Sequence, residues 1–304
     1  MAGSQDFAAD PRNANALIWL NGKLVTRDAA KVSVFDAGFV VGDGVWEGLR
    51  LHKGRLMFLD AHLNRLFQGA DAIGLDIGMS RAQVAAALDA LLRANRMEDG
   101  VHLRLMVTRG EKTGANQDPR NALGVPTVVI LAEWKVPSPS IVTEGLKLAT
   151  VGIRCTPAHM FDMRLNSHSR LNLIIALNEA IRAGADEAIM LDPDGFVSSC
   201  NATNFFWVRD GEVRTSTGAF CFNGVTRANV LALCTANKIP LKIGNFPIED
   251  ARGADEAFVT GTFGGLTPVR EIDGRALPQA LPGPRTAQLR ALYEALKDAE
   301  AARK

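Results

Sequence analysis

Residues 166–172, which read NSHSRLN, are the part of the sequence around which the rest is organised. The helix that they open is expected to run to Arg182, and the residues GADEA follow at 184–188. An apolar strand at 189–191, a DPDG turn and a second stretch of strand-forming residues at 196–208 come next. Lys147 and Lys238 are consecutive lysines, so this whole stretch contains no lysine.

Length and composition exclude several classes of function. A chain of 304 residues has room for two domains or one large one, and 47% hydrophobic residues support a substantial core. A net charge of +1 argues against nucleic acid or an anionic membrane as a partner. No apolar run approaches the roughly 20 residues of a membrane span. Composition and charge therefore give no indication of a nucleic-acid or membrane partner.

The cysteines show neither a CxxC motif nor the spacing of a metal site, so we expect no metal. Without a recognisable signal peptide they indicate reduced thiols in a cytoplasmic protein. They are Cys155, Cys200, Cys221 and Cys234.

The distribution of Pro, Gly and polar residues predicts the division of the chain. Residues 1–15 are small and polar and are expected to form a flexible tail. The prolines of VPSPS are expected to stiffen an extended linker. The predicted segments are the tail at 1–15, an N-terminal α+β domain at 16–135, a linker at 136–142, and a C-terminal α/β domain with a C-terminal helix at 143–304.

Local patterns predict individual elements. Asn21-Gly22 after an apolar strand indicates a tight hairpin, and KVSV at 31–34 indicates a strand. A helix is expected from Leu59 with Asp60 as its N-cap, and further strands at 102–108 and 127–132. The loop between those strands has the composition of a mobile or substrate-covering loop. Further helices are expected at 80–95, 167–183, 226–237 and 284–301.

Five sequence blocks occur in a characteristic order. They are LNGK (20–23), DAG with GDGVWEGLR (36–38 and 42–50), HLNRL (62–66), GVTR (224–227), and AFVTGT with TPVREIDGR (257–262 and 267–275). Together they resemble the class IV aminotransferases, the fold-type IV pyridoxal phosphate (PLP) enzymes that include branched-chain and D-amino-acid aminotransferases. The resemblance implies an α+β, two-domain architecture with a ligand cleft between the domains, a homodimer, and a small amino or keto acid as substrate.

The resemblance assigns a phosphate-binding cup to Arg65, Val225, Thr226, Gly261 and Thr262. The residue types suit a phosphate, which needs a guanidinium, backbone N–H groups and hydroxyls. Taken alone, Arg65 would rather be interpreted as an exposed helix arginine and Thr226 as an ordinary residue of a helix N-terminus. The cup could hold PLP or pyridoxamine phosphate (PMP).

The sequence departs from the family at three groups directed at the cofactor. The Schiff-base lysine belongs near Leu165, Asn166 or Ser167, none of which can form an imine. The glutamate that faces the pyridine nitrogen is replaced by Ser199, which carries no charge. The chain's one tyrosine, Tyr293, lies in the C-terminal helix rather than beside the cofactor. We therefore do not expect a covalent internal aldimine, and we expect conventional transamination to be absent or very slow.

Several residues are candidates for a replacement chemistry. His168 could act as acid or base at neutral pH, or could simply bond nearby backbone at a helix start. Arg170 could meet an anionic substrate or be a surface cation. Arg104 and Arg109 match positions that branched-chain and D-amino-acid enzymes respectively use for substrate carboxylates. Because one residue number is even and the other odd, their side chains are expected on opposite faces of a regular strand.

The remaining polar residues near Ser199 have two interpretations each. Asn201 and Asn204 could turn the strand or bind the ligand. Cys200 could face the ligand or be an inert buried thiol. Glu47 is expected to be structural or an ion-pair partner.

Three functions are compatible with these features. The first is a class IV aminotransferase-like protein with a retained phosphate cup and a non-standard mechanism. The second is a PLP-independent enzyme on the same scaffold, with His168 acting on a carboxylate or phosphate substrate. The third is a non-catalytic protein that binds PLP or a related phosphate ligand.

Overall fold

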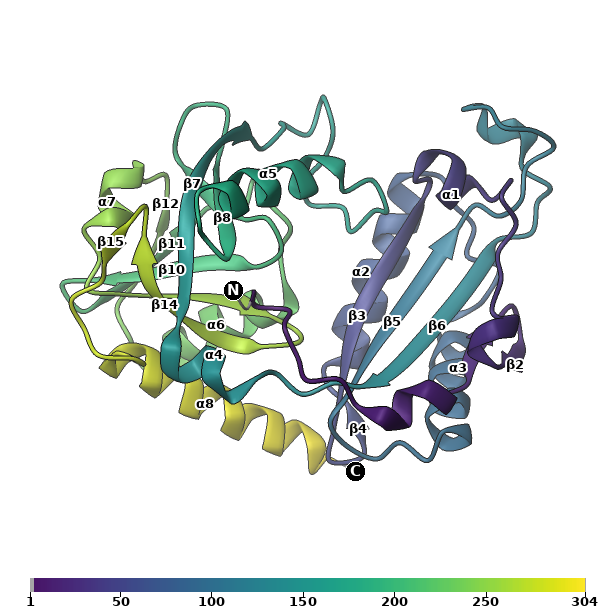
Figure 1. Ribbon diagram of the computed structural model, residues 1–304, viewed down its shortest axis with the longest axis horizontal. Coiled ribbons are helices and arrows are strands. Elements are labelled where there is room, and N and C mark those ends of the chain that lie inside the picture. The colour runs from purple at the N-terminus through teal and green to yellow at the C-terminus, as the bar shows by residue number, and fades with distance from the viewer. Residues whose placement is uncertain (1–2, 304) are drawn as a thin grey trace. The chain divides into compact units, whose positions relative to one another are not determined.

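The computed structural model describes residues 3–303 and divides them into two compact units. The expected α+β class is confirmed, because each unit contains a β-sheet with helices packed against it (Figure 1). The N-terminal unit comprises residues 9–136, 165–170 and 300–303, and the C-terminal unit comprises residues 3–8, 137–164 and 171–299. The short segment 165–170 thus belongs to the N-terminal unit although its neighbours in sequence do not.

The N-terminal unit is built on a six-stranded antiparallel sheet with the strand order β2-β1-β6-β5-β3-β4. Helices α2 and α3 pack on one face of this sheet (Figure 1). The elements are β1 (Ile18–Leu20), β2 (Lys23–Val25), α1 (Ala37–Val41), β3 (Gly44–His52), β4 (Arg55–Leu56), α2 (Leu59–Ala72), α3 (Arg81–Ala94), β5 (Val101–Thr108) and β6 (Thr127–Trp134), with 3₁₀-helices at Pro11–Asn15, Arg27–Ala29 and Pro119–Asn121.

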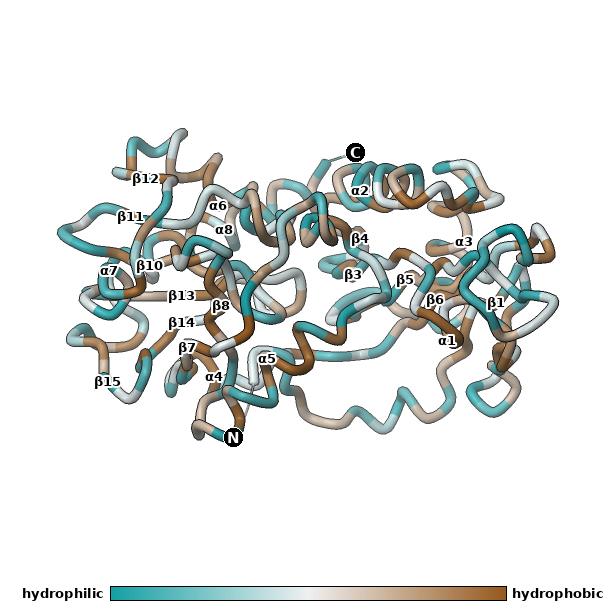
Figure 2. The backbone as a smooth tube through the Cα atoms, turned by 90° about the horizontal axis from the view of Figure 1, so that it is seen from above, coloured by the Kyte–Doolittle hydropathy of each residue, from teal (hydrophilic) through white to brown (hydrophobic). Residues whose placement is uncertain are grey.

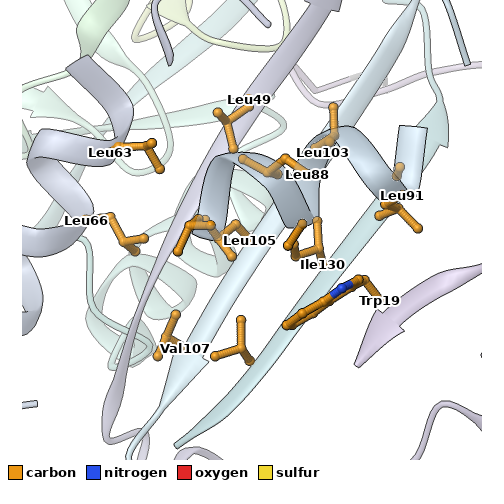
Figure 3. Close-up of a cluster of buried hydrophobic side chains, with 14 of the residues drawn as sticks. Trp19, Leu49, Leu63, Leu66, Leu88, Leu91, Leu103, Leu105, Val107 and Ile130 are labelled. Carbon is orange, nitrogen blue, oxygen red and sulfur yellow. The ribbon is translucent and has the colours of Figure 1, made fainter. Parts of the chain in front are cut away.

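Strand alternation decides which face of this sheet forms the core. In β5 the odd-numbered residues are buried and the even-numbered residues are half-buried, the pattern of a strand with one face against helices. Figure 3 shows Leu103 and Leu105 of β5 in one cluster with Leu66 of α2 and Leu88 of α3. The other face therefore carries the even-numbered residues, and it holds most of the candidate site in this unit.

The C-terminal unit contains a nine-stranded mixed sheet, with β7 parallel to both β8 and β14. Helix α5 packs on β7 and β8, and α6 packs near β12 and β13. The elements are α4 (Pro139–Glu144), β7 (Leu146–Arg154), α5 (Leu171–Arg182), β8 (Glu187–Leu191), β9 (Val197–Cys200), β10 (Asn204–Arg209), β11 (Glu212–Ser216), α6 (Val225–Ala236), β12 (Leu241–Gly244), α7 (Ile248–Arg252), β13 (Glu256–Gly261), β14 (Gly265–Ile272), β15 (Arg275–Ala276) and α8 (Pro284–Ala301).

Helix α5 has apolar residues beyond those that it buries. Its buried residues are Ala176 and Ala180, whereas Leu171 and Ile174 are exposed. Figure 2 shows the hydrophobic colouring of this helix. The small alanines allow α5 to approach β7 and β8 closely.

Most of the predicted elements are confirmed, but the helix expected at 167–183 begins only at Leu171, as α5. The Asn21-Gly22 hairpin joins β1 to β2, and the expected helix at 80–95 is α3, with Ser80 and Gln83 forming a capping box. The strand predicted at 31–34 is wrong, since those residues form no strand. Asp60 is not an N-cap: α2 begins at Leu59, after Phe58 in a left-handed conformation, and Asp60 lies in the first turn.

The structure also differs from the expected tail and linker. Residues 1–2 lie outside the described residues, but Ser4 is buried and donates a hydrogen bond to the side chain of Glu187, so the following residues are not loose. Helix α4 begins at Pro139, inside the segment expected to be extended. Proline is well tolerated in the first turn of a helix, where its missing N–H is not needed.

Candidate functional site

The segment Leu165–Arg170 lies along the edge of β3. Trp46 N donates to Asn166 O (2.9 Å) and His168 N donates to Gly44 O (2.9 Å), and Val45 pairs with Ser167 in an antiparallel bridge. The segment therefore extends the N-terminal sheet as a short additional strand. β4 pairs with β3 only at Leu51 and His52, so it leaves this part of the edge open.

Gly44 permits this close approach. A Cβ atom at Gly44 would lie 2.6 Å from Cδ2 of His168 and 2.5 Å from the carbonyl oxygen of Val107. Both distances are shorter than real Cβ contacts allow. Only glycine therefore fits between the segment and β5.

Asn166 is held by its own side chain as well as by its backbone. Its amide nitrogen donates to Trp46 O (2.5 Å), and its amide oxygen accepts a hydrogen bond from the Arg170 guanidinium. Trp46 Nε1 adds a hydrogen bond to Ser167 O (3.1 Å). The Asn166 side chain thus fastens the segment to β3.

Two arginines lie against the indole ring of Trp46. The guanidinium carbon of Arg104 is 3.4 Å from the ring centroid, and that of Arg170 is 5.6 Å from it. The side chain of Arg104 has this room because Gly48 is its partner in the register of β3 and β5. The structure thus brings together two of the predicted candidates, and adds Trp46, to which sequence reasoning assigned no role.

Arg65 is engaged by a buried carboxylate. Its Nε and Nη2 donate to Oε1 and Oε2 of Glu47, both at 2.7 Å, and His62 Nδ1 lies 2.8 Å from Glu47 Oε2. Glu47 is fully buried, so its interpretation as an ion-pair partner is confirmed. Burial alone would raise the Glu47 pKa, but the hydrogen bonds from Arg65 and His62 outweigh burial and lower it. Arg65 is therefore not an exposed helix arginine.

His168 is enclosed rather than presented to solvent. Its Nε2 is buried and has no hydrogen-bond partner among residues 3–303. Burial and the charge of Arg104 lower its pKa, partly offset by a hydrogen bond with the Val45 backbone. The imidazole is therefore neutral near pH 7, and the structure favours the interpretation in which His168 bonds nearby backbone.

Arg109 has a structural role in the N-terminal unit. It lies one residue beyond the end of β5, and Nε and Nη2 donate to the Asp43 carboxylate at 2.6 and 3.1 Å. The guanidinium also donates to the carbonyl oxygens of Ile73 and Gly74 at 2.8 and 2.6 Å. These bonds use most of its donors, so the prediction that Arg109 binds substrate carboxylate is not supported.

Two of the predicted phosphate-binding residues, Val225 and Thr226, lie at the start of α6 in the C-terminal unit. The helix begins at Val225, and no side chain of the described residues caps it. Asn204 Oδ1 accepts from Gly224 N (3.0 Å) and Asn204 Nδ2 donates to Phe222 O (2.6 Å), which fixes the turn before the helix. The N–H groups of the first turn lie at the positive end of α6, where an anion is favoured.

Thr226 and Tyr293 face each other in this unit. Their hydroxyl oxygens are 3.5 Å apart and both residues are buried. Burial raises the Tyr293 pKa to about 12, so the phenol is neutral. The sequence placed Tyr293 away from any ligand; in the structure it lies behind the predicted phosphate-binding threonine.

Ser199 and Asn201 make bonds that shape β9. Ser199 Oγ donates to Thr203 O (2.8 Å) and accepts from Asn204 Nδ2 (3.2 Å). Asn201 Oδ1 accepts from Ala188 N (2.8 Å), which favours the interpretation that Asn201 turns the strand. Cys200 is buried and burial raises its pKa well above the usual value, as expected of an inert thiol.

Gly261 and Thr262 lie where β13 ends. Gly261 is the last residue of β13, and Thr262 begins the turn into β14. A Cβ atom at Gly261 would meet only Thr203 Cγ2, at 3.6 Å, an ordinary contact. The fold itself therefore does not demand glycine at this position.

Two further classes of site are not found among residues 3–303. No group of three or more His, Cys, Asp or Glu side chains is arranged to hold a metal ion, and all four cysteines are free and buried. No helix in this range has the length and apolar character needed to cross a membrane.

Comparison with known proteins identifies related sequences. The profile of the family described as amino-transferase class IV matches residues 44–272. Branched-chain-amino-acid aminotransferase-like protein 2 of Arabidopsis thaliana is 39% identical over 95% of this chain. The chain spans only about half of that protein, 51% of its length. A putative branched-chain-amino-acid aminotransferase of Methanocaldococcus jannaschii is 35% identical, with 92% of this chain and 96% of the relative covered.

Solved structures show the same architecture. A T.th. branched-chain amino acid aminotransferase with pyridoxamine 5'-phosphate superposes with a TM-score of 0.85 at 28% identity. The match covers 93% of this chain and 95% of that one. A branched-chain aminotransferase from Thermoproteus uzoniensis with norvaline gives a TM-score of 0.83 at 30% identity, with 93% and 95% covered.

Proposed function

Because the chain belongs to the class IV aminotransferase family, we propose that it binds a PLP-type cofactor through the phosphate alone and acts on a small amino or keto acid. Conventional transamination through a lysine is absent or very slow in this proposal. The observation that carries it is the side chain of Asn166. The family's lysine belongs at or beside this position, and the Asn166 amide is occupied by Trp46 and Arg170.

The C-terminal unit has groups that suit the phosphate. Val225 and Thr226 begin α6 without a side-chain cap from the described residues, and Thr262 lies in the turn after β13. These residues would hold the phosphate by backbone N–H groups and hydroxyls. The pyridoxamine 5'-phosphate named for the T.th. structure supports a cofactor of this class.

The residues present do not fit a covalently held cofactor. Between Lys147 and Lys238 the sequence has no lysine amine to attach it. Ser199, which stands where the family has a glutamate, is neutral and already donates its proton to Thr203 O. A PLP-type cofactor supplies a carbonyl or amine and an electron-accepting ring when bound. In this chain Asn166 could not form a covalent bond with the cofactor, and Ser199 could not place a negative charge beside its pyridine nitrogen.

The alternative that assigns acid or base chemistry to His168 has less support. An acid or base must reach the proton that it transfers, within hydrogen-bond distance or through one water. Nε2 of His168 is buried. Arg104 is better placed to act on a ligand, since it is half-buried and its guanidinium stacks on the face of Trp46.

Titration of the purified protein with PLP, followed by borohydride reduction and mass spectrometry, tests the proposal. We expect saturable binding without a reduced adduct on any lysine. Thr226→Val should weaken binding about tenfold, because a charge-assisted hydrogen bond is lost. Thr235→Val, an exposed position on the same helix, is the matched control and should leave binding unchanged.

Three results would each contradict part or all of the proposal. A trapped adduct on a lysine would mean that a distant amine reaches the cofactor and that the mechanism is the conventional one. A failure of PLP and PMP to bind would leave no cofactor role. If the cofactor binds but no amino or keto acid is converted at any measurable rate, the protein is a binding protein rather than an enzyme.

A further inference from the structure

We propose that residues 3–8 form a strap on the C-terminal unit, which is fastened where Ser4 meets the buried carboxyl group of Glu187 and which opens as that group loses its proton. Opening of the strap loosens the turn that carries Thr262. This second part rests on the proposed function, because Gly261 and Thr262 are assigned there to the cofactor phosphate. The first part can be tested without any cofactor.

The strap belongs to the C-terminal unit, although the chain enters the N-terminal unit at residue 9. The backbone of Phe7 forms an antiparallel bridge with Pro137. The Phe7 ring meets the Phe263 ring edge-on, with centroids 6.4 Å apart and planes at 79°. The strap is therefore held by Phe7 at one end and by Ser4 at the other.

Glu187 is the first residue of β8, and its carboxyl group is buried without a cation beside it. The residue is 2% exposed. The side chains that hydrogen-bond it are two hydroxyls, Ser4 Oγ and Thr203 Oγ1, the latter at 2.6 Å from Oε2. Among residues 3–303 the charged group that contributes to its pKa is Asp186, which is another anion. A carboxylate in such surroundings is costly, so the fastened strap favours the protonated group.

The direction of the pH effect follows from this burial. Burial raises the Glu187 pKa above the ordinary 4.5, and the hydrogen bonds from Ser4 and Thr203 only partly offset it. With the strap open, water replaces Ser4 and the pKa returns toward 4.5. The stability that Glu187 gives the strap is thus fully present below pH 4.5 and is lost as the pH rises through the raised pKa. The nearby thiol of Cys200 stays neutral, because burial raises its pKa as well.

The strap lies against the turn between β13 and β14. Phe263, which the Phe7 ring meets, is in the middle of this turn. The next residue is Gly264, where a Cβ atom would lie 3.6 Å from Ser4 O. The turn begins at Thr262. Displacement of the strap therefore removes packing from the turn that carries a predicted phosphate-binding residue.

Thr203 connects Glu187 to the start of the same turn. Its hydroxyl donates to Glu187, and its Cγ2 is 3.6 Å from the position that a Cβ atom would take at Gly261. Its carbonyl oxygen accepts a hydrogen bond from Ser199 Oγ at 2.8 Å. Thr203 thus contacts both the group that titrates and a residue of the predicted phosphate-binding cup.

Hydrogen–deuterium exchange of the full chain, purified without added cofactor, tests the strap. The unaltered protein and Glu187→Gln are compared at equal pH between pH 5 and pH 9, so that the intrinsic exchange rates cancel. Glutamine has nearly the shape of the protonated carboxyl group but cannot ionise. We expect exchange of residues 3–8 in the unaltered protein to rise about tenfold relative to the variant, since opening that releases one proton changes at most tenfold per pH unit.

Two further variants control this experiment. Glu249→Gln, at an exposed position of α7, should match the unaltered protein at every pH. Ser4→Ala removes the strap's side-chain bond to Glu187, so strap exchange should be raised at pH 5 and should depend less on pH. This variant decides the question if Glu187→Gln does not fold, which thermal unfolding establishes. A ratio of unaltered protein to Glu187→Gln that stays constant with pH, or unchanged exchange in Ser4→Ala, would overturn the proposal.

PMP binding, followed by absorbance at pH 6 and pH 8, tests the second part. We expect the affinity of the unaltered protein for PMP to fall at least about threefold relative to Glu187→Gln between these pH values, because fewer molecules keep the turn in place. An equal ratio at both pH values would overturn the connection between the strap and the phosphate. If neither PMP nor PLP binds at either pH, the proposed function and this second part both fail, and the exchange result still decides the first part.

Discussion

The Arg65 guanidinium and the Glu47 carboxylate form a two-point ion pair, with Nε–Oε1 and Nη2–Oε2 both at 2.7 Å. Glu47 has no exposed surface, so its charge is balanced within the protein. Removing one member of such a pair leaves the other without its partner, which is costly. The pair joins β3 to α2 and supports the strand on which Trp46 lies.

Glu47→Gln is expected to lower the free energy of unfolding by about 3 kcal/mol near pH 7. The Glu47 pKa is held below its ordinary 4.5, so the ionised carboxylate favours the folded state above that pH and this contribution is lost as the pH falls through the folded-state pKa. Urea unfolding of both proteins between pH 8 and pH 3 measures it. A difference that stays constant down to pH 3 would contradict the assignment.

Gly44→Ala is expected to displace the segment Leu165–Arg170 from β3, because the added Cβ would lie 2.6 Å from the His168 ring and 2.5 Å from Val107 O. Overpacking of this kind costs roughly 1–3 kcal/mol. Limited proteolysis at Arg164 and Arg170, together with thermal unfolding, measures the change. Gly69→Ala is the control. Gly69 lies in helix α2, and its added Cβ would meet only Val45 Cγ1, at 3.5 Å, so this substitution should be neutral or stabilising.

Asn166→Lys is expected to create a lysine that borohydride can trap with PLP. The new amine replaces an amide that now bonds Trp46 O and Arg170. Absorbance titration and peptide mapping of the reduced protein locate the adduct. Ser167→Lys, one residue on, is the control and should give less adduct. An adduct of equal yield in the unaltered protein would show that some other lysine already serves.

His102 is expected to make the N-terminal unit sensitive to acid. Burial, with the charges of Lys135, Arg50 and Arg104, lowers its pKa from 6.5 to about 3. Between those values the unfolded chain binds a proton that the folded chain does not, so acid favours unfolding, by at most about 1.4 kcal/mol per pH unit. His102→Asn should reduce the loss of stability between pH 6.5 and pH 4. Parallel pH profiles for the two proteins would refute this.

The sequence alone predicts those elements whose formation depends on residues close together in the chain. Asn21-Gly22 predicts a hairpin because few residues other than Gly and Asn adopt positive φ, and both do so here. Ser80 predicts the start of α3 because its hydroxyl caps a backbone N–H three residues on. The strand predicted at 31–34 failed because β-forming residues alone do not provide a partner strand.

The site depends on contacts between residues far apart in sequence. The pairing of Arg109 with Asp43 spans 66 residues, and that of Asn166 with Trp46 spans 120. No local pattern indicates either. Trp46 lies within the GDGVWEGLR block, but its contact with Arg104 and Arg170 depends on residues from a neighbouring strand and from the segment 165–170.

The return of residues 165–170 to the N-terminal unit has a consequence for biosynthesis. A chain that emerges from the ribosome from its N-terminus has made all of β1 to β6 by residue 134, yet the edge of β3 at Gly44–Trp46 still lacks its partner. That edge gains the backbone bonds to Asn166 and His168 only after more than 30 further residues have been translated. During this interval an unpaired strand edge is available to other chains, so slow translation through residues 137–170 would favour aggregation of the nascent protein.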